Sequence, residues 1–245
     1  DKHTMPQRNS RTLRIGTRGS KLALAQAGIV RSGLAAKGFA NVEIVVLKTS
    51  GDRIQDRSLA DAGGKGLFTK ELEDALLGER IDLAVHSMKD VPVTIPAGLA
   101  ISALLAREDP RDAFISNTAK RLADLPKGSV FGTSSVRRHA QVARARPDLN
   151  IKLLRGNVDT RLAKLDAGEF DGMLLAVAGL KRLGLADRIT AYLDTKGWLP
   201  ALAQGAVGIE IRETDTQARE ITSQLNDPTT EVVLNCERAF QFALD

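Results

Sequence analysis

Arg107-Glu108-Asp109-Pro110-Arg111-Asp112 interrupts the apolar pattern of the chain with five charges around one proline. An apolar run at residues 99–106 precedes this stretch, and a new series of strand and helix patterns begins at residue 130. Residues 194–204 contain a glycine and a proline and indicate a return crossing, after which the apolar run 207–212 is expected back in the first unit. The stretch therefore predicts a chain that crosses from one domain to another and then returns.

Short apolar runs alternate with helical periodicity on both sides of this crossing. Repeated βα units favour parallel sheets with helices on both faces. The predicted fold class is therefore α/β, with two parallel-sheet βα domains, residues 13–106 plus 206–225 and residues 111–199. Strands are expected at 13–17, 42–47, 81–86, 99–106, 130–132, 151–154, 172–177 and 207–212, and helices at 20–37, 67–77, 135–146, 158–167, 214–225 and from 227 to the end.

Composition and charge narrow the possible functions. With 43% hydrophobic and 27% charged residues the chain is globular, and no apolar run approaches the roughly 20 residues that span a bilayer. The net charge of +5 suggests an anionic ligand, whereas few aromatic residues and no long basic run argue against nucleic acid. A single cysteine, Cys236, excludes an internal disulfide, and no spacing of histidine, cysteine and carboxylate supports a metal site. These features predict a cytoplasmic protein with neither membrane nor nucleic-acid partners.

A long polar and glycine-containing stretch, residues 48–66, stands between two apolar elements. Loops of this length are uncommon in compact domains unless they are functional, so we expect a lid over the ligand site. Lys65 lies in Gly63-Gly64-Lys65-Gly66, which differs from a phosphate-binding P-loop because the spacing and the hydroxyl residue after the lysine are missing.

Hydroxyl and basic side chains follow one predicted strand after another. The carboxyl ends of the strands in open α/β sheets meet at the ligand site, and helix N-termini and arginine forks both favour anions. The pattern predicts a ligand with several carboxylates or phosphates. The residues in question are Arg18, Gly19 and Ser20; Ser87, Met88, Lys89 and Asp90; Thr133, Ser134, Ser135, Arg137 and Arg138; and Arg155, Gly156, Asn157 and Arg161.

Each of these signals has an ordinary explanation when it is taken alone. An arginine after a strand is commonly a solvated charge, and a Thr-Ser-Ser sequence before a helix is commonly an N-cap. Arg137 and Arg138 point about 100° apart on a helix, so that one of them could face solvent. The anion site is favoured because the same residue types recur at equivalent positions in both units.

Asp90 is a carboxylate among these cations. It could form a salt bridge to Lys89 or a neighbouring arginine, or it could stabilise a cation that forms during a reaction. His86 lies in an apolar strand and is expected to be a satisfied core histidine, and His139 is expected to be exposed.

Two other classes of protein fit parts of this pattern. A two-lobed solute carrier would share the architecture, although it has no need of a carboxylate among the cations. A nucleic-acid binder would spread its basic side chains over an outer face instead of gathering them at strand ends.

Several motifs together resemble those of the porphobilinogen deaminase (hydroxymethylbilane synthase) family, in the same order and from about residue 13 to the end. They are Thr17-Arg18-Gly19-Ser20, Gly63-Gly64-Lys65-Gly66-Leu67-Phe68, His86-Ser87-Met88-Lys89-Asp90-Val91-Pro92, Arg107 to Asp112, Gly132-Thr133-Ser134-Ser135-Val136-Arg137-Arg138, Leu154-Arg155-Gly156-Asn157, Leu175-Ala176-Val177-Ala178-Gly179-Leu180 and Gln204-Gly205-Ala206-Val207-Gly208.

The resemblance implies a transferase that joins four porphobilinogen units head to tail, with loss of ammonia, into hydroxymethylbilane for heme biosynthesis. It implies two domains like type II periplasmic binding proteins, a third small α/β domain, a monomer, and a dipyrromethane cofactor held on a cysteine by a thioether. Each unit would lose ammonia to give an electrophile, which the free α-position of the growing chain attacks.

The resemblance also implies roles for particular residues. Asp90 would be the catalytic carboxylate, hydrogen-bonded to pyrrole N–H groups. The acetate and propionate side chains of cofactor and substrate would be held by Arg18, Ser20, Lys89, Thr133, Ser134, Ser135, Arg137, Arg138, Arg155, Gly156 and Arg161. Contacts to the substrate or the active-site loop would come from Lys65, Phe68, Arg182 and Gln204.

The last helix bears on the third domain. Residues 227–245 would be the start of that domain, truncated here, and the cofactor cysteine would follow within a few residues of Asp245. Cys236 precedes Glu237-Arg238-Ala239-Phe240 and is therefore expected to be an ordinary thiol. A chain that ends at Asp245 is expected to be inactive, because it lacks that cysteine.

Overall fold

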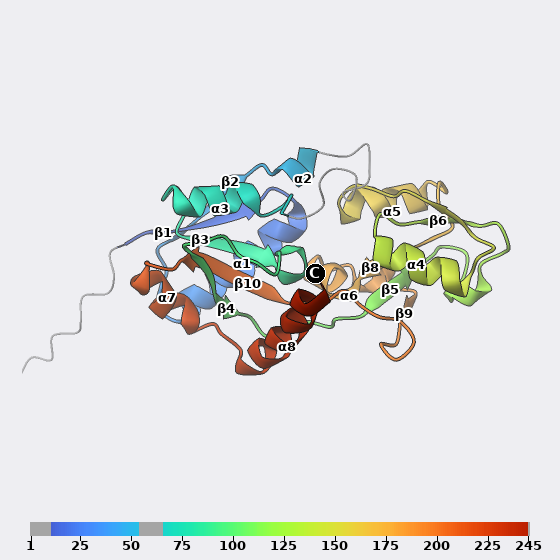
Figure 1. The fold of residues 1–245 in the computed structure, drawn as a ribbon. Coiled ribbons are helices and arrows are strands. Elements are labelled where there is room, and N and C mark those ends of the chain that lie inside the picture. The colour runs from blue at the N-terminus through green and yellow to red at the C-terminus, as the bar shows by residue number, and fades with distance from the viewer. Residues whose placement is uncertain (1–10, 54–65, 245) are drawn as a thin grey trace, which may run out of the picture.

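A computed structural model describes residues 11–53 and 66–244 and shows two lobes, each built on a five-stranded sheet (Figure 1). The first lobe holds both the early elements and the segment that follows the return crossing. Its elements are β1 (Leu13–Arg18), α1 (Lys21–Ala36), β2 (Val42–Leu47), α2 (Ser50–Arg53), α3 (Lys70–Leu77), β3 (Leu83–Ser87), η1 (Met88–Asp90), β4 (Leu99–Leu104), β10 (Val207–Arg212), α7 (Thr216–Ser223) and α8 (Pro228–Leu244).

The second lobe repeats the βα pattern with shorter elements. They are β5 (Asp112–Ile115), η2 (Leu122–Asp124), β6 (Val130–Gly132), α4 (Val136–Ala145), β7 (Asn150–Lys152), α5 (Val158–Asp166), β8 (Gly172–Ala176), α6 (Val177–Arg182), η3 (Ala186–Arg188) and β9 (Ala191–Tyr192). The strand orders are β2-β1-β3-β10-β4 in the first sheet and β7-β6-β8-β5-β9 in the second. The predicted two-sheet α/β architecture is therefore confirmed.

Each sheet is mixed instead of wholly parallel as we expected. In the first sheet β10 runs antiparallel to β3 and β4, and in the second β5 runs antiparallel to β8 and β9. These are the two strands that directly follow a crossing between the lobes. A strand that enters from the other lobe starts at the edge where the parallel strands end, so it runs in the opposite direction.

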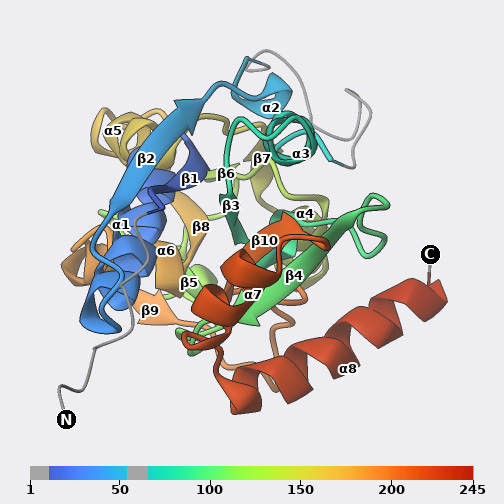
Figure 2. The same ribbon diagram turned by 90° about the vertical axis from the view of Figure 1, so that its left-hand side faces the viewer.

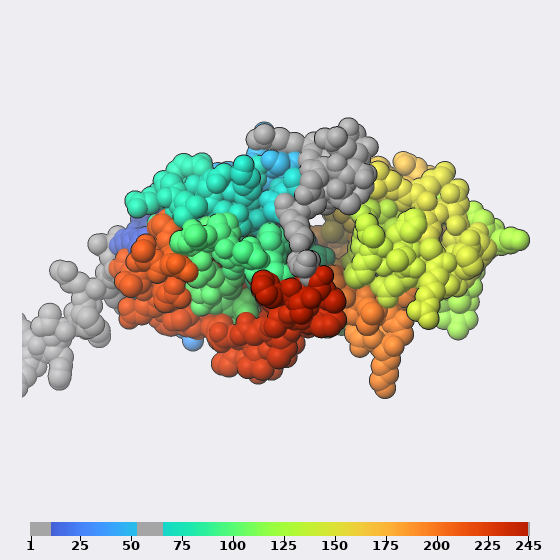
Figure 3. All heavy atoms as spheres, in the orientation of Figure 1, coloured from blue at the N-terminus to red at the C-terminus, as the bar shows by residue number. Residues whose placement is uncertain are grey.

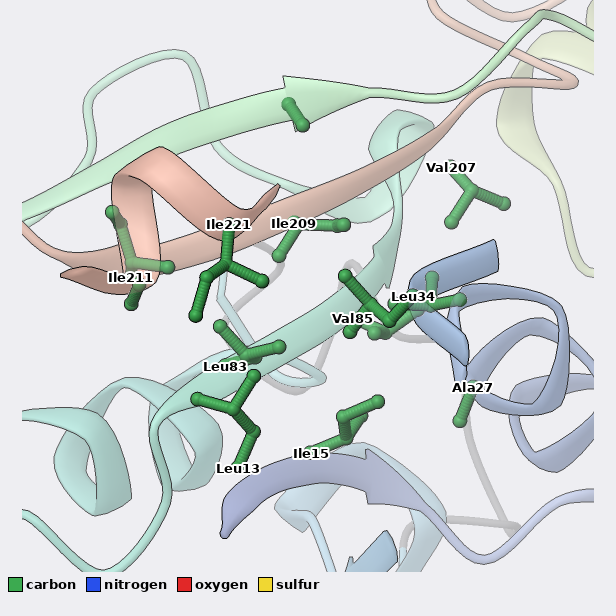
Figure 4. Packing of buried hydrophobic residues seen from close by; sticks show 13 residues of the cluster. Leu13, Ile15, Ala27, Leu34, Leu83, Val85, Val207, Ile209, Ile211 and Ile221 are labelled. Carbon is green, nitrogen blue, oxygen red and sulfur yellow. The ribbon is translucent and has the colours of Figure 1, made fainter. Parts of the chain in front are cut away.

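The larger core lies between the first sheet and the helices α1 and α7 (Figure 4). Alternate residues of β1, β3 and β10 point to this face, and the helices cover it with small and branched side chains. Burial of this apolar surface is the main force that holds the first lobe together. The fully or almost fully buried members are Leu13, Ile15, Ala27, Val30, Leu34, Leu83, Val85, Ala103, Val207, Ile209, Ile211, Ala218 and Ile221.

The two crossings run side by side and are joined by backbone hydrogen bonds. The Leu105 amide donates to the Val207 carbonyl over 3.0 Å, and the Glu108 amide donates to the Gly205 carbonyl over 3.1 Å. Gly205 has a φ of +89°, and a Cβ there would lie 2.4 Å from the Glu108 carbonyl oxygen. Only glycine fits this position, because the crossings approach too closely for a side chain.

Helix α8 packs against the first lobe beside the crossings (Figures 2 and 3). Its Leu234 is fully buried, and its Glu237 accepts hydrogen bonds from the Arg107 guanidinium over 2.6 and 3.1 Å and from the Ala203 amide over 2.6 Å. Arg238 donates to the carbonyls of the loop that follows the η1 turn, at residues 91–93. The helix is therefore attached to both crossings and to that loop.

The structure describes only part of the predicted lid. The predicted loop at residues 48–66 contains the short helix α2, while residues 54–65, which include most of the predicted lid, lie outside the described residues. Within the described ranges, no helix is both long and apolar enough to cross a membrane.

A buried ion cluster joins β1, β3 and the turn after β10. Asp82 is 3% exposed and accepts hydrogen bonds from Arg11 over 2.7 Å, Arg14 over 3.0 Å and Arg212 over 3.2 Å, while Arg11 and Arg212 also contact Asp215. Burial alone would raise the pKa of Asp82, but the hydrogen bonds from Arg14 and Arg11 outweigh it and hold the pKa well below the usual range.

Replacing this carboxylate should destabilise the fold in a pH-dependent way. We expect Asp82→Asn to lower the free energy of unfolding at pH 7 by about 3 kcal/mol, because it removes the buried charge that Arg11, Arg14 and Arg212 share. The folded-state pKa of Asp82 lies below the unfolded-state value, so its contribution is complete above about pH 4 and is lost as the pH falls further. Urea denaturation at pH 7 and in acid should show the variant and the wild type converge at low pH.

The matched control is Asp124→Asn, which removes the same group from an exposed pair with Arg121. It should leave the denaturation midpoint unchanged, because exposed ion pairs contribute little. Equal losses for the two variants would contradict the importance assigned to the buried cluster.

Candidate active site

A pocket of about 500 Å³, open to solvent, lies at the carboxyl ends of β1 and β3. It is the place where sequence analysis expected the ligand side chains of the first lobe. Six of the predicted residues line it together, namely Arg18, Ser20, Phe68, Ser87, Lys89 and Asp90, with Leu22, Ala23, Gln26, Thr69, Val85 and His86 beside them.

Arg18 is held in the pocket by an aromatic ring and a carboxylate. Its guanidinium lies 4.0 Å from the centre of the Phe68 ring and pairs with Asp52, with Nε at 3.1 and 3.2 Å from the two oxygens. Gly51 lacks a side chain here because a Cβ would lie 2.3 Å from the Phe68 ring. The guanidinium is therefore fixed before any ligand arrives. Sequence analysis did not identify Asp52, which stands in the stretch assigned to a loop.

The η1 turn places Lys89 and Asp90 directly after β3. The Met88 amide donates to the Ala206 carbonyl over 3.0 Å, which ties this turn to the second crossing. None of the ion pairs between described residues includes Asp90, so its carboxylate is available to a ligand. The alternative of a salt bridge from Asp90 to Lys89 or to a described arginine is not what the structure shows.

The Lys89 side chain is exposed to solvent at the surface of the cleft, but the protein around it displaces part of its hydration. Its Nζ lies 3.5 Å from the Gln204 Oε1. Partial loss of hydration lowers the pKa of Lys89 to about 8, against the attraction of Asp90, and the charge of Arg138 lowers it further. Its ammonium charge is therefore present at neutral pH and disappears in mild base.

A hydrogen-bonded pair of Gln26, which the sequence did not mark as a pocket residue, and Ser87, which it did, also lines the pocket. Gln26 and Ser87 exchange hydrogen bonds over 3.0 and 3.2 Å, with Gln26 almost fully buried. Sequence analysis assigned Gln26 to the buried face of a helix, and nothing in its helical spacing distinguishes a residue at a pocket from one in a core.

Hydroxyl and amide side chains cap the helices that point at the cleft. Ser20 accepts from the Ala23 amide at the start of α1, Ser135 from the Arg138 amide at the start of α4, and Asn157 from the Thr160 amide at the start of α5. The capping role expected for the Thr-Ser-Ser sequence is confirmed at Ser135, and capping leaves the hydroxyl hydrogens of Ser20 and Ser135 free to donate to an anion.

One buried carboxylate organises the arginines of the second lobe. Asp112, fully buried at the start of β5, accepts hydrogen bonds from Arg137 over 2.7 Å, Arg138 over 2.8 Å, Trp198 over 3.1 Å and Gln204 over 2.9 Å. Burial would raise the pKa of Asp112, but the charges and hydrogen bonds of Arg138 and Arg137 hold it well below its usual range. Both arginines are therefore turned toward the crossing instead of one facing solvent. From the sequence, Asp112 was assigned only to the charged stretch that joins the two domains.

Arg155 and Arg161 stand at the end of the second lobe that faces the cleft. The Arg161 Nε donates to the Gly156 carbonyl over 2.7 Å, and Gly156 has a φ of +115°, where a Cβ would lie 2.9 Å from Thr160. Burial lowers the pKa of Arg161 to about 10, with the charges of Arg138 and Arg155 acting in the same direction and that of Asp90 opposing them.

Charges from the two lobes therefore act on one another across the cleft. Lys89 of the first lobe responds to Arg137 and Arg138 of the second, and Arg161 of the second responds to Asp90 of the first. The arrangement combines several cations and hydroxyl donors with one carboxylate that accepts hydrogen bonds. It can bind a ligand with several carboxylates and can stabilise a positive charge that develops beside Asp90.

The remaining predicted residues lie elsewhere. Gln204 is fully buried between the crossings, donating to Pro110 and Asp112, and Arg182 donates to the Gly205 carbonyl over 2.6 Å. Both therefore contact the crossings rather than line the pocket. Lys65 lies outside the described residues. No group of three or more potential metal ligands occurs among the residues that the structure places, and Cys236 is exposed on α8.

Solved structures with a similar fold include substrate-binding proteins. A periplasmic substrate-binding protein of an ABC transporter from Coxiella burnetii superposes with a TM-score of 0.56 at 12% identity, over 93% of this chain and 97% of that one. The methionine-binding protein MetQ gives a TM-score of 0.54 at 14% identity, over 93% and 95% of the two chains. At such identities the similarity shows the fold alone, and it confirms the predicted likeness to periplasmic binding proteins.

Sequence comparison identifies a more specific relationship. Residues 13–220 match the family model described as porphobilinogen deaminase, dipyromethane cofactor binding domain. The porphobilinogen deaminase of Syntrophobacter fumaroxidans is 52% identical over 96% of this chain and 76% of its own length, and that of Nitrobacter hamburgensis is 56% identical over 94% and 74%. With a family model over most of its length and relatives above 50% identity, the chain belongs to the porphobilinogen deaminase family.

Proposed function

We propose that the cleft between the lobes is the active site of a hydroxymethylbilane synthase, with Asp90 as its catalytic carboxylate. Membership of the family makes the chain a transferase that joins porphobilinogen units, with loss of ammonia, in tetrapyrrole biosynthesis. The observation that carries the site assignment is the chain of contacts between the lobes. Lys89, next to Asp90, lies 3.5 Å from Gln204, and Gln204 donates over 2.9 Å to Asp112, which also holds Arg137 and Arg138.

The residues present fit the dipyrromethane cofactor that the family model names. Pyrrole rings with acetate and propionate side chains need cations for their carboxylates and an acceptor for their N–H groups, and the cleft offers both. When bound, the cofactor supplies the pyrrole carbon to which the first unit is added. The residues that would hold its carboxylates and those of the substrate are Arg18, Ser20, Lys89, Thr133, Ser134, Ser135, Arg137, Arg138, Arg155, Gly156 and Arg161, with Lys65, Phe68, Arg182 and Gln204 in contact with the substrate or the neighbouring loop.

Asp90 is the acceptor and the counter-charge in this arrangement. Its carboxylate accepts hydrogen bonds from pyrrole N–H groups and lies where positive charge develops as the amine leaves. The surrounding cations bind the carboxylates of the ligand and leave Asp90 to face the ring. Such a preorganised charge lowers the barrier because it needs no reorientation during the reaction.

We also propose domain boundaries, a cellular location and an oligomeric state for this protein. We assign residues 13–106 plus 206–225 and residues 111–199 to two domains, and residues 227–245, whose helix α8 packs against the first lobe in this structure, to the start of a third. The single cysteine in 245 residues is typical of a reducing compartment, which supports a cytoplasmic location. We propose that the protein acts there as a monomer.

Removing the charge of Asp90 should abolish most of the chemistry without affecting the fold. Asp90→Asn should slow single-turnover condensation of porphobilinogen by about 100-fold or more in the cofactor-loaded enzyme, because one preorganised charge contributes about 3 kcal/mol or more to the transition state. Circular dichroism should be unchanged. A near-native rate would remove Asp90 from the mechanism.

The affinity for porphobilinogen should fall as the pH rises through about 8. Lys89 binds a carboxylate only while it is charged, and its pKa lies at about 8 in the free protein. Calorimetric titration from pH 6.5 to 9.5 should show this loss, and Lys89→Arg should remove the dependence in that range because its guanidinium stays charged. The assignment of Lys89 would not survive a wild-type affinity that is flat over this range.

Arg137 should contribute to binding while a matched surface arginine should not. Arg137→Gln should weaken porphobilinogen binding by about 10-fold or more, since a charged hydrogen bond contributes about 1.5–3 kcal/mol. The fold should survive, because Arg138, Trp198 and Gln204 still satisfy Asp112. Arg144→Gln, an exposed change on the same helix, is the control. Equally small effects at the two positions would mean that Arg137 is an ordinary solvated charge.

A further inference from the structure

His86 and Glu210 form a buried pair directly behind the pocket. The His86 Nε2 lies 2.7 Å from the Glu210 Oε2, and the two side chains are 3% and 0% exposed. His86 also lines the pocket that contains Lys89 and Asp90. As expected from the sequence, this histidine is satisfied within the core, but its partner and its place at the pocket were not foreseen.

Among the described residues, His86 is the hydrogen-bond partner of the Glu210 side chain. The other oxygen of Glu210, Oε1, is buried and has no hydrogen-bond partner in the described part of the chain. Burial raises the pKa of Glu73 on α3, and the negative charge of Glu210 adds to the shift. Arg238 of α8 is the other charged group whose interaction with Glu210 is evident. A buried carboxylate in this position depends on its contact with His86.

The backbone around Glu210 is arranged to bring it to His86. On β10, Gly208 lies opposite His86 and Glu210 opposite Ala84, so the pair spans the two strands diagonally. On the other side of β10, the pairing with β4 shifts by one residue between Ile209 and Glu210. Irregularities of this kind turn side chains and occur often near active sites.

The pair stands at the root of the turn that carries the reactive groups. His86 is followed by Ser87 and then by the η1 turn with Lys89 and Asp90. On the opposite strand, Gly208 leaves space that Met88 fills, since a Cβ at Gly208 would lie 2.1 Å from the Met88 sulfur. The bond between His86 and Glu210 thus locks the last residues of β3 to β10 just before the turn begins.

We propose that His86 and Glu210 are positioning residues, whose bond holds the η1 turn so that Asp90 and Lys89 face the cations of the second lobe. The pair does not need to touch the ligand in this role. The bond acts by fixing the direction of the chain where β3 ends and the η1 turn begins. The inference rests on the proposed assignment of Asp90 and Lys89 to the active site.

The test replaces the pair in two ways that preserve the fold. His86→Gln keeps an amide nitrogen near the position of Nε2 and can still donate to Glu210. The double variant His86→Leu with Glu210→Met removes both polar groups together, and exchange of a buried pair for apolar residues of similar size is often neutral for stability. Thr222→Val is the control, because it removes the hydrogen bonds of another buried side chain, to Ser102 and to the Ala218 carbonyl, from the same lobe away from the turn.

Two measurements separate a positioning role from a purely structural one. In the cofactor-loaded enzyme the double variant should lose about 10-fold or more in kcat with an unchanged thermal midpoint, while His86→Gln should retain most of it. In porphobilinogen binding, the pH at which affinity falls should move in the double variant from about 8 toward the ordinary lysine value of 10.5, because a released turn takes Lys89 away from the surrounding protein and from the charge of Arg138. Thr222→Val should change neither quantity.

The outcomes distinguish this inference from the proposed site. A double variant that folds and matches the wild type in kcat and in the pH of its affinity loss overturns the positioning role. A lowered kcat with the wild-type pH dependence also overturns it, since the turn would then have kept its place. If the wild type itself shows no loss of affinity in base, the assignment of Lys89 fails instead, whatever the variants do.

Discussion

Asp112 is the group on which the geometry of the cleft depends. It is a carboxylate without exposure to solvent, and it would be costly to bury there without partners. Its partners come from α4, from the segment before the second crossing and from that crossing itself, so the carboxylate joins the two arginines to the hinge between the lobes. Any movement of one lobe against the other must therefore keep or break this set of bonds. The arginines that face the cleft are thus directed by the same contact that holds the crossings together.

In the first lobe, other contacts fix the charged side chains that line the pocket. Arg18 is fixed by stacking on Phe68 and by pairing with Asp52, and the turn with Lys89 and Asp90 is fixed by its bond to the second crossing. In both lobes a structural carboxylate pairs with an arginine of the proposed ligand site, while Asp90 alone has no such partner in the described part of the site. The distinction explains how one carboxylate can act on a ligand among many cations. The others neutralise arginines, and Asp90 remains available.

A large part of the fold and of the site could be predicted from local patterns. The strand positions and the caps Ser20 and Ser135 follow from periodicity and short-range hydrogen bonding, which depend on neighbours in the chain. Because strand ends converge in an α/β sheet, the positions of Arg18, Lys89 and Asp90 could be inferred as well. The direction of β5 and β10 could not, because an apolar run is the same in either orientation. The orientation is decided by which edge of the sheet the crossing reaches.

The sequence by itself determined the family, the two sheets and the chemical character of the ligand site, because motif order, apolar periodicity and residue type are all local properties of the chain. Only the tertiary structure decided which carboxylates serve the architecture and which is available for chemistry. Asp52, Asp112 and Asp90 are the same residue type in similar charged surroundings, and their roles differ by their partners. Those partners are 25 or more residues away for Arg18 with Asp52 and for Arg137 with Asp112. Pairings over such separations arise from the packing of sheets and crossings, which no local pattern specifies.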